Sequence, residues 1–161
     1  MVELVVTIVI AGIIAAVAMP RFADQRAFQS RAYFEQVQEA IKFSQKAAIA
    51  QRKRVFVTIA AASVQACYVA ACGGVGSSAV IDPTTGVALA VVPQEARNNA
   101  TITFPVTLDP PTTLVFDGLG RPRSAADVLL TAPTTISVKS SATGDIDRNI
   151  VIEAETGYVH N

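Results

Sequence analysis

The N-terminal segment constrains this chain more strongly than any other part of it. Residues 4–19 include no charged side chain, a single carboxylate at Glu3 precedes them, and Pro20 follows them. A helix over residues 4–19 would be about 24 Å long, slightly shorter than the roughly 30 Å hydrocarbon core of a bilayer. The segment therefore predicts a membrane anchor that needs the residues beside it to complete a span.

Two simpler interpretations of this segment are less favoured. A secretory signal peptide begins with basic residues and ends at a small-residue cleavage site, whereas this segment begins with an acid and ends in Pro20-Arg21. A plain single-pass anchor leaves Glu3 unexplained, because an ionisable group at the edge of an apolar segment is costly unless a cation or snorkelling satisfies it. Glu3 therefore indicates that the anchor also has a partner.

Gly12 and Pro20 are the two weak points of the expected helix. Gly12 lowers helix propensity by about 1 kcal/mol, and Pro20 removes an amide donor and clashes with the preceding turn. We expect a kink or local melting from Gly12 to Pro20. The alternative is that Pro20 ends an anchor helix and a linker follows.

The residues after Pro20 favour a continuing helix. Residues 21–54 contain neither Gly nor Pro, and their apolar positions recur every three or four residues. One helix from near Met1 to about Arg54 would be roughly 80 Å long. The cations at residues 52–54 suit its C-terminal end, where the macrodipole favours positive charge.

The remaining residues, 55–161, have a sequence pattern typical of an antiparallel sheet, with short β-branched runs separated by turn residues. The expected strands are 55–60, 64–69, 79–81, 87–91, 101–104, 113–116, 135–138, 150–154 and 158–159. Turns are expected at 73–74, 82–86, 109–111, 117–118, 120–122, 143–145 and 156–157. The predicted architecture is α+β. It comprises a hydrophobic segment (1–22), the amphipathic half of a long helix (23–54), and a sheet head (55–161). One face of the sheet is exposed to solvent and the other packs on the long helix.

The first 22 residues resemble the N-terminal signature of type IV pilins and type II secretion pseudopilins, with Glu3, Gly12 and Pro20 to Phe22 in the register of that family. The resemblance implies a class III signal peptide, which prepilin peptidase removes before the new amine is methylated. The family glutamate is the fifth residue and Glu3 is the third, so two residues are expected ahead of Met1. The resemblance also implies insertion in the bacterial inner membrane and extraction by an assembly platform.

The head carries a second resemblance in short pieces. Residues 47–52 leading into 55–58, then Val115-Phe-Asp-Gly-Leu-Gly-Arg121 and Glu155-Thr-Gly-Tyr-Val159, are similar to the domain of H-type pseudopilins and competence minor pilins. This similarity implies the pilin fold, in which the long helix packs on the antiparallel head.

Charge supports association between copies of this chain. If many such helices bundle, the carboxylate of Glu3 can meet the α-amino group of a neighbour, an attraction that is stronger at low dielectric. Residues 1–54 hold eight Lys or Arg and four Asp or Glu, a difference of +4, while residues 55–161 hold five and nine, a difference of −4. Patches of opposite charge on the helix and the head would favour staggered packing of neighbouring copies. The alternative is that these charges only keep exposed faces solvated.

Cys67 and Cys72 lie five residues apart and are the two cysteines of the chain. In a periplasmic or extracellular domain, this spacing predicts a disulfide that closes a small loop, and buried free thiols are the alternative. We expect no metal site, because two thiolates and the single His160 cannot complete a tetrahedral shell.

Motifs for catalysis are lacking in the sequence: it contains no Walker loop, no GxSxG elbow and no HExxH. We predict no enzymatic activity and no cofactor. Nucleic acid is disfavoured as a partner, because the head is net acidic and residues 154–161 contain no Lys or Arg. Arg121 and Arg123 are the candidates for a weak DNA contact.

The sequence thus predicts a structural subunit of a type IV pilus-like filament of identical copies, polymerised through the N-terminal helix. Such a subunit would be a single-pass inner-membrane protein before assembly, then part of an extracellular pilus or periplasmic pseudopilus. The alternatives are a type II secretion pseudopilin that forms a short pseudopilus and a DNA-uptake minor pilin.

Overall fold

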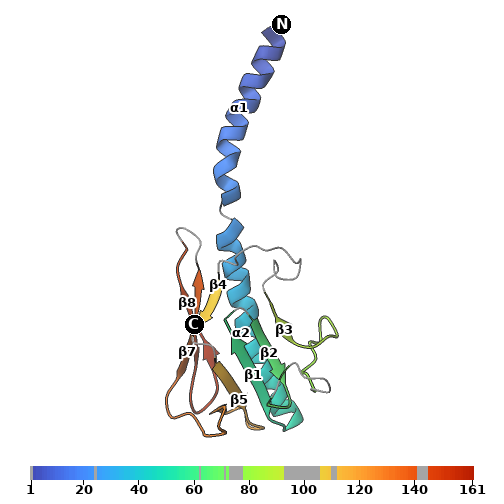
Figure 1. Cartoon of the computed structure of the whole chain (residues 1–161), viewed down its shortest axis with the longest axis vertical. Coiled ribbons are helices and arrows are strands. Elements are labelled where there is room, and N and C mark those ends of the chain that lie inside the picture. The colour runs from blue at the N-terminus through green and yellow to red at the C-terminus, as the bar shows by residue number, and fades with distance from the viewer. Residues whose placement is uncertain are drawn as a thin grey trace.

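A computed structural model describes residues 2–23, 25–61, 63–70, 72, 78–92, 106–109, 112–140 and 145–161. Over these residues the chain forms α1 (Val2–Ala23) and α2 (Gln25–Gln51), followed by a head of antiparallel strands. Figure 1 shows α1 projecting away from the head, with the N-terminus at its far end, and α2 lying along the head. The chain therefore has the expected α+β architecture.

The single helix expected from near Met1 to about Arg54 is divided into α1 and α2, and the helical part differs from the sequence expectation in two further respects. The partial melting expected from Gly12 to Pro20 is not present, because α1 is α-helical throughout Val2–Ala23. Although Pro20 lacks one amide donor and crowds the preceding turn, α1 continues past it, and the neighbouring alanines favour a helix. The alternative that Pro20 ends the helix is wrong for the same reason. The kink expected in the same stretch stays a prediction.

The second difference is the end of α2, which falls at Gln51 and not near Arg54. Arg52 adopts a left-handed conformation with φ 50°. The Arg52 N–H then donates to the Ile49 carbonyl at 3.3 Å, and the Lys53 N–H donates to the Ala48 carbonyl at 3.2 Å. This is a Schellman motif, which satisfies the last carbonyls of a helix. The basic cluster therefore follows the last turn of α2 and is not part of it.

The head contains two sheets, where the sequence predicted one. The first has five strands in the order β3-β2-β1-β5-β6 and the second four in the order β4-β7-β8-β9. The strands of the first sheet are β1 (Val55–Ala60), β2 (Ser63–Cys67), β3 (Ala90–Val91), β5 (Thr112–Phe116) and β6 (Pro122–Ser124). Those of the second are β4 (Val106–Asp109), β7 (Thr134–Ser140), β8 (Arg148–Ile152) and β9 (Val159–His160). Because β1 already has β2 and β5 on its two edges, the C-terminal strands pair among themselves.

Most strand predictions are confirmed in position, and β1 agrees with its prediction at both ends. Residues 79–81 and most of 87–91 form only isolated bridges, Cys67 with Ala79 and Ile81 with Ala88, before β3. The strand predicted at 101–104 lies outside the described residues. Strands β4 and β6 were not predicted, because prolines beside or within them indicated turns. Pro122 is nevertheless compatible with β6, since β6 is an edge strand that needs no donor on its outer side.

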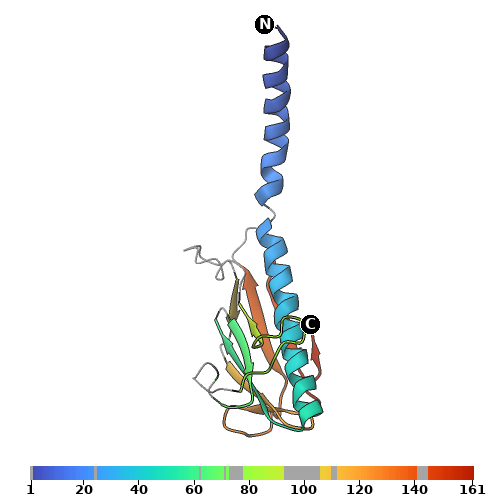
Figure 2. The same ribbon diagram turned by 90° about the vertical axis from the view of Figure 1, so that its right-hand side faces the viewer.

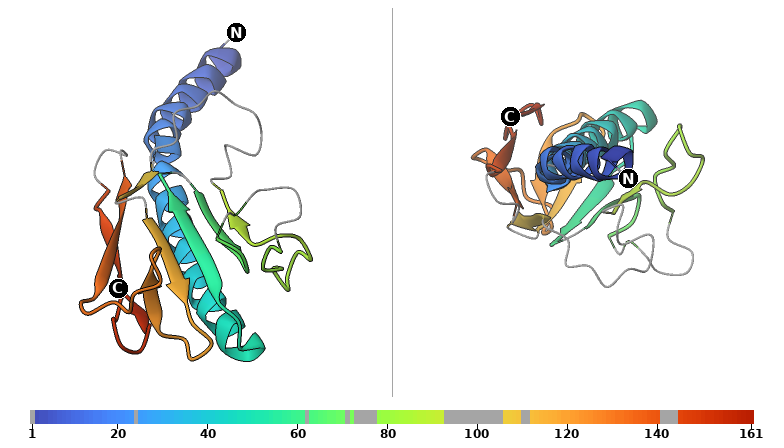
Figure 3. Two further views of the ribbon diagram at one scale, coloured as in Figure 1. Left: turned by 60° about the horizontal axis from the view of Figure 1, so that its bottom comes forward. Right: turned by 90° about the horizontal axis from the view of Figure 1, so that it is seen from above.

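The core lies between α2 and the inward faces of both sheets. Strand β1 alternates buried and half-buried residues, as expected of a strand with one face on a core. The side chains from α2 that pack there include Tyr33, Phe34, Val37, Ala40, Ile41, Ala47 and Ala48. They meet strand residues that include Val57, Ile59, Phe116, Ile136, Ile150 and Ile152. Figures 2 and 3 show both sheets against one side of α2, so the opposite face of α2 is uncovered.

Candidate assembly surface

Helix α1 presents an apolar surface on all sides. Every side chain from residue 2 to residue 16 is exposed. The nine large apolar ones are between 49% and 78% exposed: Val2, Leu4, Val5, Val6, Ile8, Val9, Ile10, Ile13 and Ile14. No described part of the head covers them (Figure 1). A helix that is hydrophobic all round is typical of a buried environment, which the described part of the head does not provide for residues 2–16.

Glu3 lies in the first turn of α1 and is exposed. It forms no ion pair with any residue that the structure describes. A carboxylate at this position suits the positive end of the helix dipole. The only charge on the first 15 described residues of α1 is therefore at its tip. In the part of the chain that is described, no helix has the combination of length and hydropathy required to cross a bilayer.

The beginning of α2 is fastened to the second sheet by a buried ionic cluster. Arg148, on β8, donates from Nη2 to Asp145 Oδ1 at 2.7 Å, and the Asp145 side chain is only 3% exposed. The Ser30 hydroxyl, on α2, donates to Asp145 Oδ2 and accepts from Arg148 Nη1 at 3.2 Å. Ser30 is 115 and 118 positions from its two partners, so this cluster fixes the first part of α2 to the second sheet.

The end of α2 is held at a three-way junction. Gln45 Nε2 donates to the carbonyl oxygens of Gly120 and Thr156, both at 2.9 Å. Gly120 lies in the β5–β6 turn with φ +83°, and Gly157 lies in the β8–β9 turn with φ +67°. The two sequence pieces that resemble pilin heads, residues 115–121 and 155–159, therefore meet at one side chain of α2, which links the two sheets.

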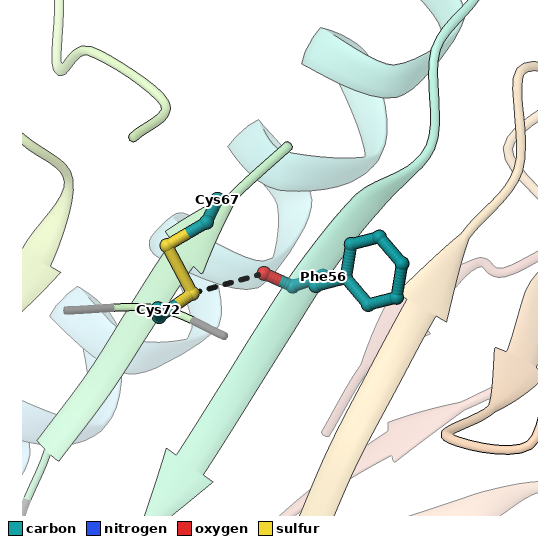
Figure 4. Close-up of a disulfide and its surroundings, with 3 residues drawn as sticks. All are labelled: Phe56, Cys67 and Cys72. Atoms are coloured by element: carbon teal, nitrogen blue, oxygen red, sulfur yellow. Dashed lines mark hydrogen bonds between the residues drawn. A yellow bond between two sulfur atoms is a disulfide. The ribbon is translucent and has the colours of Figure 1, made fainter. Parts of the chain in front are cut away.

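The predicted disulfide is present (Figure 4). Cys67 ends β2 and Cys72 follows five positions later, with 5.6 Å between their Cα atoms. That separation is within the usual range for disulfides. Cys72 Sγ lies 3.8 Å from the carbonyl oxygen of Phe56, the residue that pairs with Cys67 across β1 and β2. The disulfide thus closes a loop beside the central strand of the first sheet.

Arg121 and Arg123, the candidates for a DNA contact, are both engaged by Asp117. Arg121 Nε donates to Asp117 Oδ2 at 3.1 Å and Arg123 Nε to the same oxygen at 3.4 Å. Arg123 also lies 3.6 Å from Asp127, which pairs with Arg54 at 2.8 Å. The two arginines therefore serve a local ionic network on the head.

The pKa values of Asp117 and Asp145 are both below the ordinary aspartate value. Burial raises the pKa of Asp117, but the backbone N–H groups of Arg121 and Leu119 and the charge of Arg121 together outweigh it. For Asp145, the hydrogen bond from Arg148 is the largest cause and lowers the pKa, with burial opposing it. Both aspartates are therefore held in their ionised form by the fold.

This lowering predicts acid sensitivity. Unfolded aspartate has a pKa of about 3.9, so the stabilisation from both residues is complete above that pH and is lost as the pH falls through the lower folded values. We expect the urea midpoint of the wild type to fall between about pH 5 and pH 2. The Asp117→Asn/Asp145→Asn variant should be less stable at pH 7 and should lose less over the same pH range. An equal pH dependence of the two proteins would contradict this assignment.

Sequence reasoning missed the residues that position the helix, Ser30, Gln45 and Arg148, and the ionic role of Asp117 within the head. The role of Asp117 could have been predicted from its neighbours in the sequence, because it begins an Asp-Gly turn. Its carboxylate accepts hydrogen bonds from the N–H groups of Leu119 and Arg121. Ser30, Gln45 and Arg148 had no such local signal, since their partners are distant in sequence. Within the described residues, no group of three or more His, Cys, Asp or Glu side chains could hold a metal ion.

A long N-terminal helix whose second half packs on an antiparallel head defines the pilin fold, and this chain has it. A similar structure is the crystal structure of the type IV minor pilin FimU of Pseudomonas aeruginosa strain PAO1, with a TM-score of 0.56. The match covers 85% of this chain and 90% of the FimU chain at 12% sequence identity, so the likeness concerns the fold. No family model and no curated protein matches this chain.

Proposed function

We propose that this chain is a structural subunit of a type IV pilus-like filament, formed with identical copies through α1. The observation that carries the proposal is the uncovered apolar surface of α1 beside a head that has its own core. Full burial of one large apolar side chain is worth about 1.5–3 kcal/mol. The nine on α1 together match or exceed the ~4–15 kcal/mol that association costs in lost freedom.

The shape of the subunit favours an open polymer. Because α1 projects from one end of the head, copies that bundle their α1 helices in parallel must keep the wider heads outside the bundle (Figures 1 and 2). A contact of this kind joins two different surfaces, and it generates a helical filament unless the rotation closes a ring. In this proposal, residues 1–22 form the assembly segment, 23–54 connect it to the head, and 55–161 form the outer surface.

Before assembly, the uncharged residues 4–19 would be held in the bacterial inner membrane, from which an assembly platform extracts the subunit after prepilin peptidase has acted. The filament would then be an extracellular pilus. A periplasmic pseudopilus is the alternative, and the location of the fibres distinguishes the two. A DNA-uptake role gains no support, because Asp117 already binds Arg121 and Arg123.

The proposal is tested with the full chain, extracted from membranes in detergent. Removal of the detergent should yield fibres of uniform diameter in negative-stain electron microscopy. The Ile10→Lys variant, with a charge in the middle of α1, should yield none. Val128→Lys, at a 62% exposed position on the head, is the matched control and should assemble normally. Irregular aggregates alone from the wild type, or normal fibres from Ile10→Lys, would contradict the proposal.

A further inference from the structure

A groove runs along one edge of α2, between this helix and the hairpin of residues 79–91. The hairpin is closed by a hydrogen bond from the Asp82 N–H to the Val87 carbonyl at 2.8 Å. Its Val80 N–H donates to the Ala66 carbonyl of β2 at 2.9 Å. Figures 1 and 3 show the hairpin on the β3 side of the head, away from the second sheet. Hydrogen bonds therefore hold both walls of the groove in place.

The groove contains two hollows of about 360 Å³ each, and Phe43 lines both. Each hollow has α2 on one side and the hairpin or β2 on the other. The lining of the first includes Glu39, Ala40, Phe43, Asp82, Leu89 and Val91. The lining of the second includes Phe43, Lys46, Ala47, Tyr68, Val80 and Ile81. Hollows of this size accommodate small ligands or a few side chains of a peptide.

Apolar surface is concentrated in the middle of the groove. Phe43, Tyr68 and Leu89 pack against the core of the head but are only half-buried. Ile81, on the hairpin, is 54% exposed. Because removal of apolar surface from water is favourable, these side chains would contribute affinity to a ligand that covers them.

The two ends of the groove carry opposite charges. At the first end, Glu39 is exposed and Asp82 is half-buried. A hydrogen bond from the Thr84 N–H lowers the pKa of the Asp82 carboxyl, which is therefore ionised at neutral pH. At the second end, Lys46 is exposed. Lys42 is close to Glu39 in the sequence but lines neither hollow, and Glu39, Asp82 and Lys46 form no ion pair with any residue in the described ranges.

We propose that this groove binds an extended peptide segment of another protein, with a base at one end, an acid at the other and apolar residues between them. Glu39 and Lys46 are seven residues apart, about 10.5 Å along α2. Three residues of an extended polyproline II segment cover about 9.3 Å and return the side chain to the same side. The two charges of the ligand should therefore be three positions apart, with the base near Glu39 and Asp82 and the acid near Lys46.

A second copy of this chain does not offer a suitable segment. Within the described strands and turns, an acid and a base three positions apart occur only at Asp145 and Arg148. These two side chains pair with each other, and that of Asp145 is only 3% exposed. The occupant is therefore a segment of a different protein, and the inference does not depend on the proposed filament function.

The test measures the binding of fluorescently labelled peptides to the full chain in detergent by fluorescence anisotropy. The probe is acetyl-Lys-Leu-Pro-Glu-amide, in which proline favours the extended conformation. This probe should bind saturably to the wild type. Replacement of both its charged residues by Gln should weaken binding about fivefold or more, since an exposed ion pair contributes up to about fivefold.

Variants of the chain assign each end of the probe to one end of the groove. Glu39→Gln/Asp82→Asn should abolish the preference for Lys over Gln in the peptide, and Lys46→Gln should abolish the preference for Glu over Gln. Asn at position 82 keeps a side-chain acceptor for the Thr84 N–H, so the turn is retained. Glu35→Gln is the matched control, because Glu35 is exposed one turn before Glu39 but lines neither hollow. It should leave every affinity within about twofold of the wild type.

Four results would overturn the inference. The first is the absence of saturable binding of the Lys-Leu-Pro-Glu probe to the wild type. Equal binding of Lys-Leu-Pro-Lys would mean a site for a cation alone, and equal binding of Glu-Leu-Pro-Glu a site for an anion alone. An effect of Glu35→Gln as large as that of Glu39→Gln/Asp82→Asn would assign the preference to the overall charge of α2. The measurement is made in detergent, so the formation or absence of fibres does not affect it.

Discussion

The Glu3→Ala variant is expected to lose filament formation while its head folds normally. Glu3 lies at the tip of α1, and no described part of the head covers residues 2–16 of this helix (Figure 1). In the proposed bundle, the Glu3 carboxylate is removed from water and is satisfied by the α-amino group of a neighbouring copy. Removal of one partner from such a buried pair typically costs about 3–5 kcal/mol, because the other charge stays buried without compensation.

That cost corresponds to an increase of at least about a hundredfold in the protein concentration required for assembly. The measurement is the critical concentration of the full chain, determined by sedimentation after detergent removal. Thermal unfolding of the head should be unchanged. Glu3→Gln, which keeps the shape and removes the charge, should fail in the same way.

Thr7→Ala is the matched control for Glu3→Ala. Thr7 is exposed one turn further along α1, and its hydroxyl donates to the Leu4 carbonyl of its own helix at 2.8 Å. Its loss should leave the critical concentration within about twofold of the wild type, because the hydroxyl bonds within its own helix and has no assigned partner in a neighbouring copy. Normal assembly of Glu3→Ala would show that the carboxylate does not pair between copies.

The Gly157→Ala variant is expected to cause the largest loss of stability from a single methyl group. A Cβ at Gly157 would overlap the carbonyl oxygen of Gly120 and would lie 2.6 Å from Gln45 Nε2. Both atoms belong to the junction that joins the two sheets through α2. The alanine would also have to adopt φ +67°, which L residues disfavour by roughly 1–2 kcal/mol. With the overpacking and the weakened Gln45 hydrogen bonds, we expect a loss of about 3 kcal/mol or more.

Gly86→Ala separates the contribution of the backbone from that of packing. Gly86 has nearly the same conformation, φ +70°, but apart from its two chain neighbours no described residue has an atom within 4 Å of the position of its Cβ. Its replacement should therefore cost only the backbone term, roughly 1 kcal/mol. The two variants are compared by urea unfolding monitored by circular dichroism. Equal losses would mean that the junction of Gly157, Gly120 and Gln45 does not contribute to stability.

Much of the fold was predictable because its signals are local. The uncharged run 4–19, the absence of Gly and Pro from 21–54, and the β-branched run 55–60 each belong to a single element. Periodicity within one element is set by its own backbone geometry, so it can be detected without knowledge of partners. The same holds for the Cys67–Cys72 pair, which closes a loop of neighbouring residues. The role of Glu3 between copies remains a prediction.

Predictions that depended on partners were less successful. A single sheet was expected, because residues 112–116 and 134–140 have similar strand patterns that do not specify their neighbours. Pro122 indicated a turn, although an edge strand accepts it. Arg121 and Arg123 were considered as a basic patch, whereas the turn that begins at Asp117 places a carboxylate between them.

A long helix with an apolar first half, an antiparallel head and a disulfide could all be predicted from residues close together in the chain. The arrangement of two sheets on the same side of α2, the contact of Ser30 with Asp145 and the bonds of Gln45 to two distant turns could be known only from the folded chain. Hydrogen bonds and ion pairs across more than 70 residues depend on where the packed core places their partners. That placement also decides which face of α2 the described head leaves uncovered.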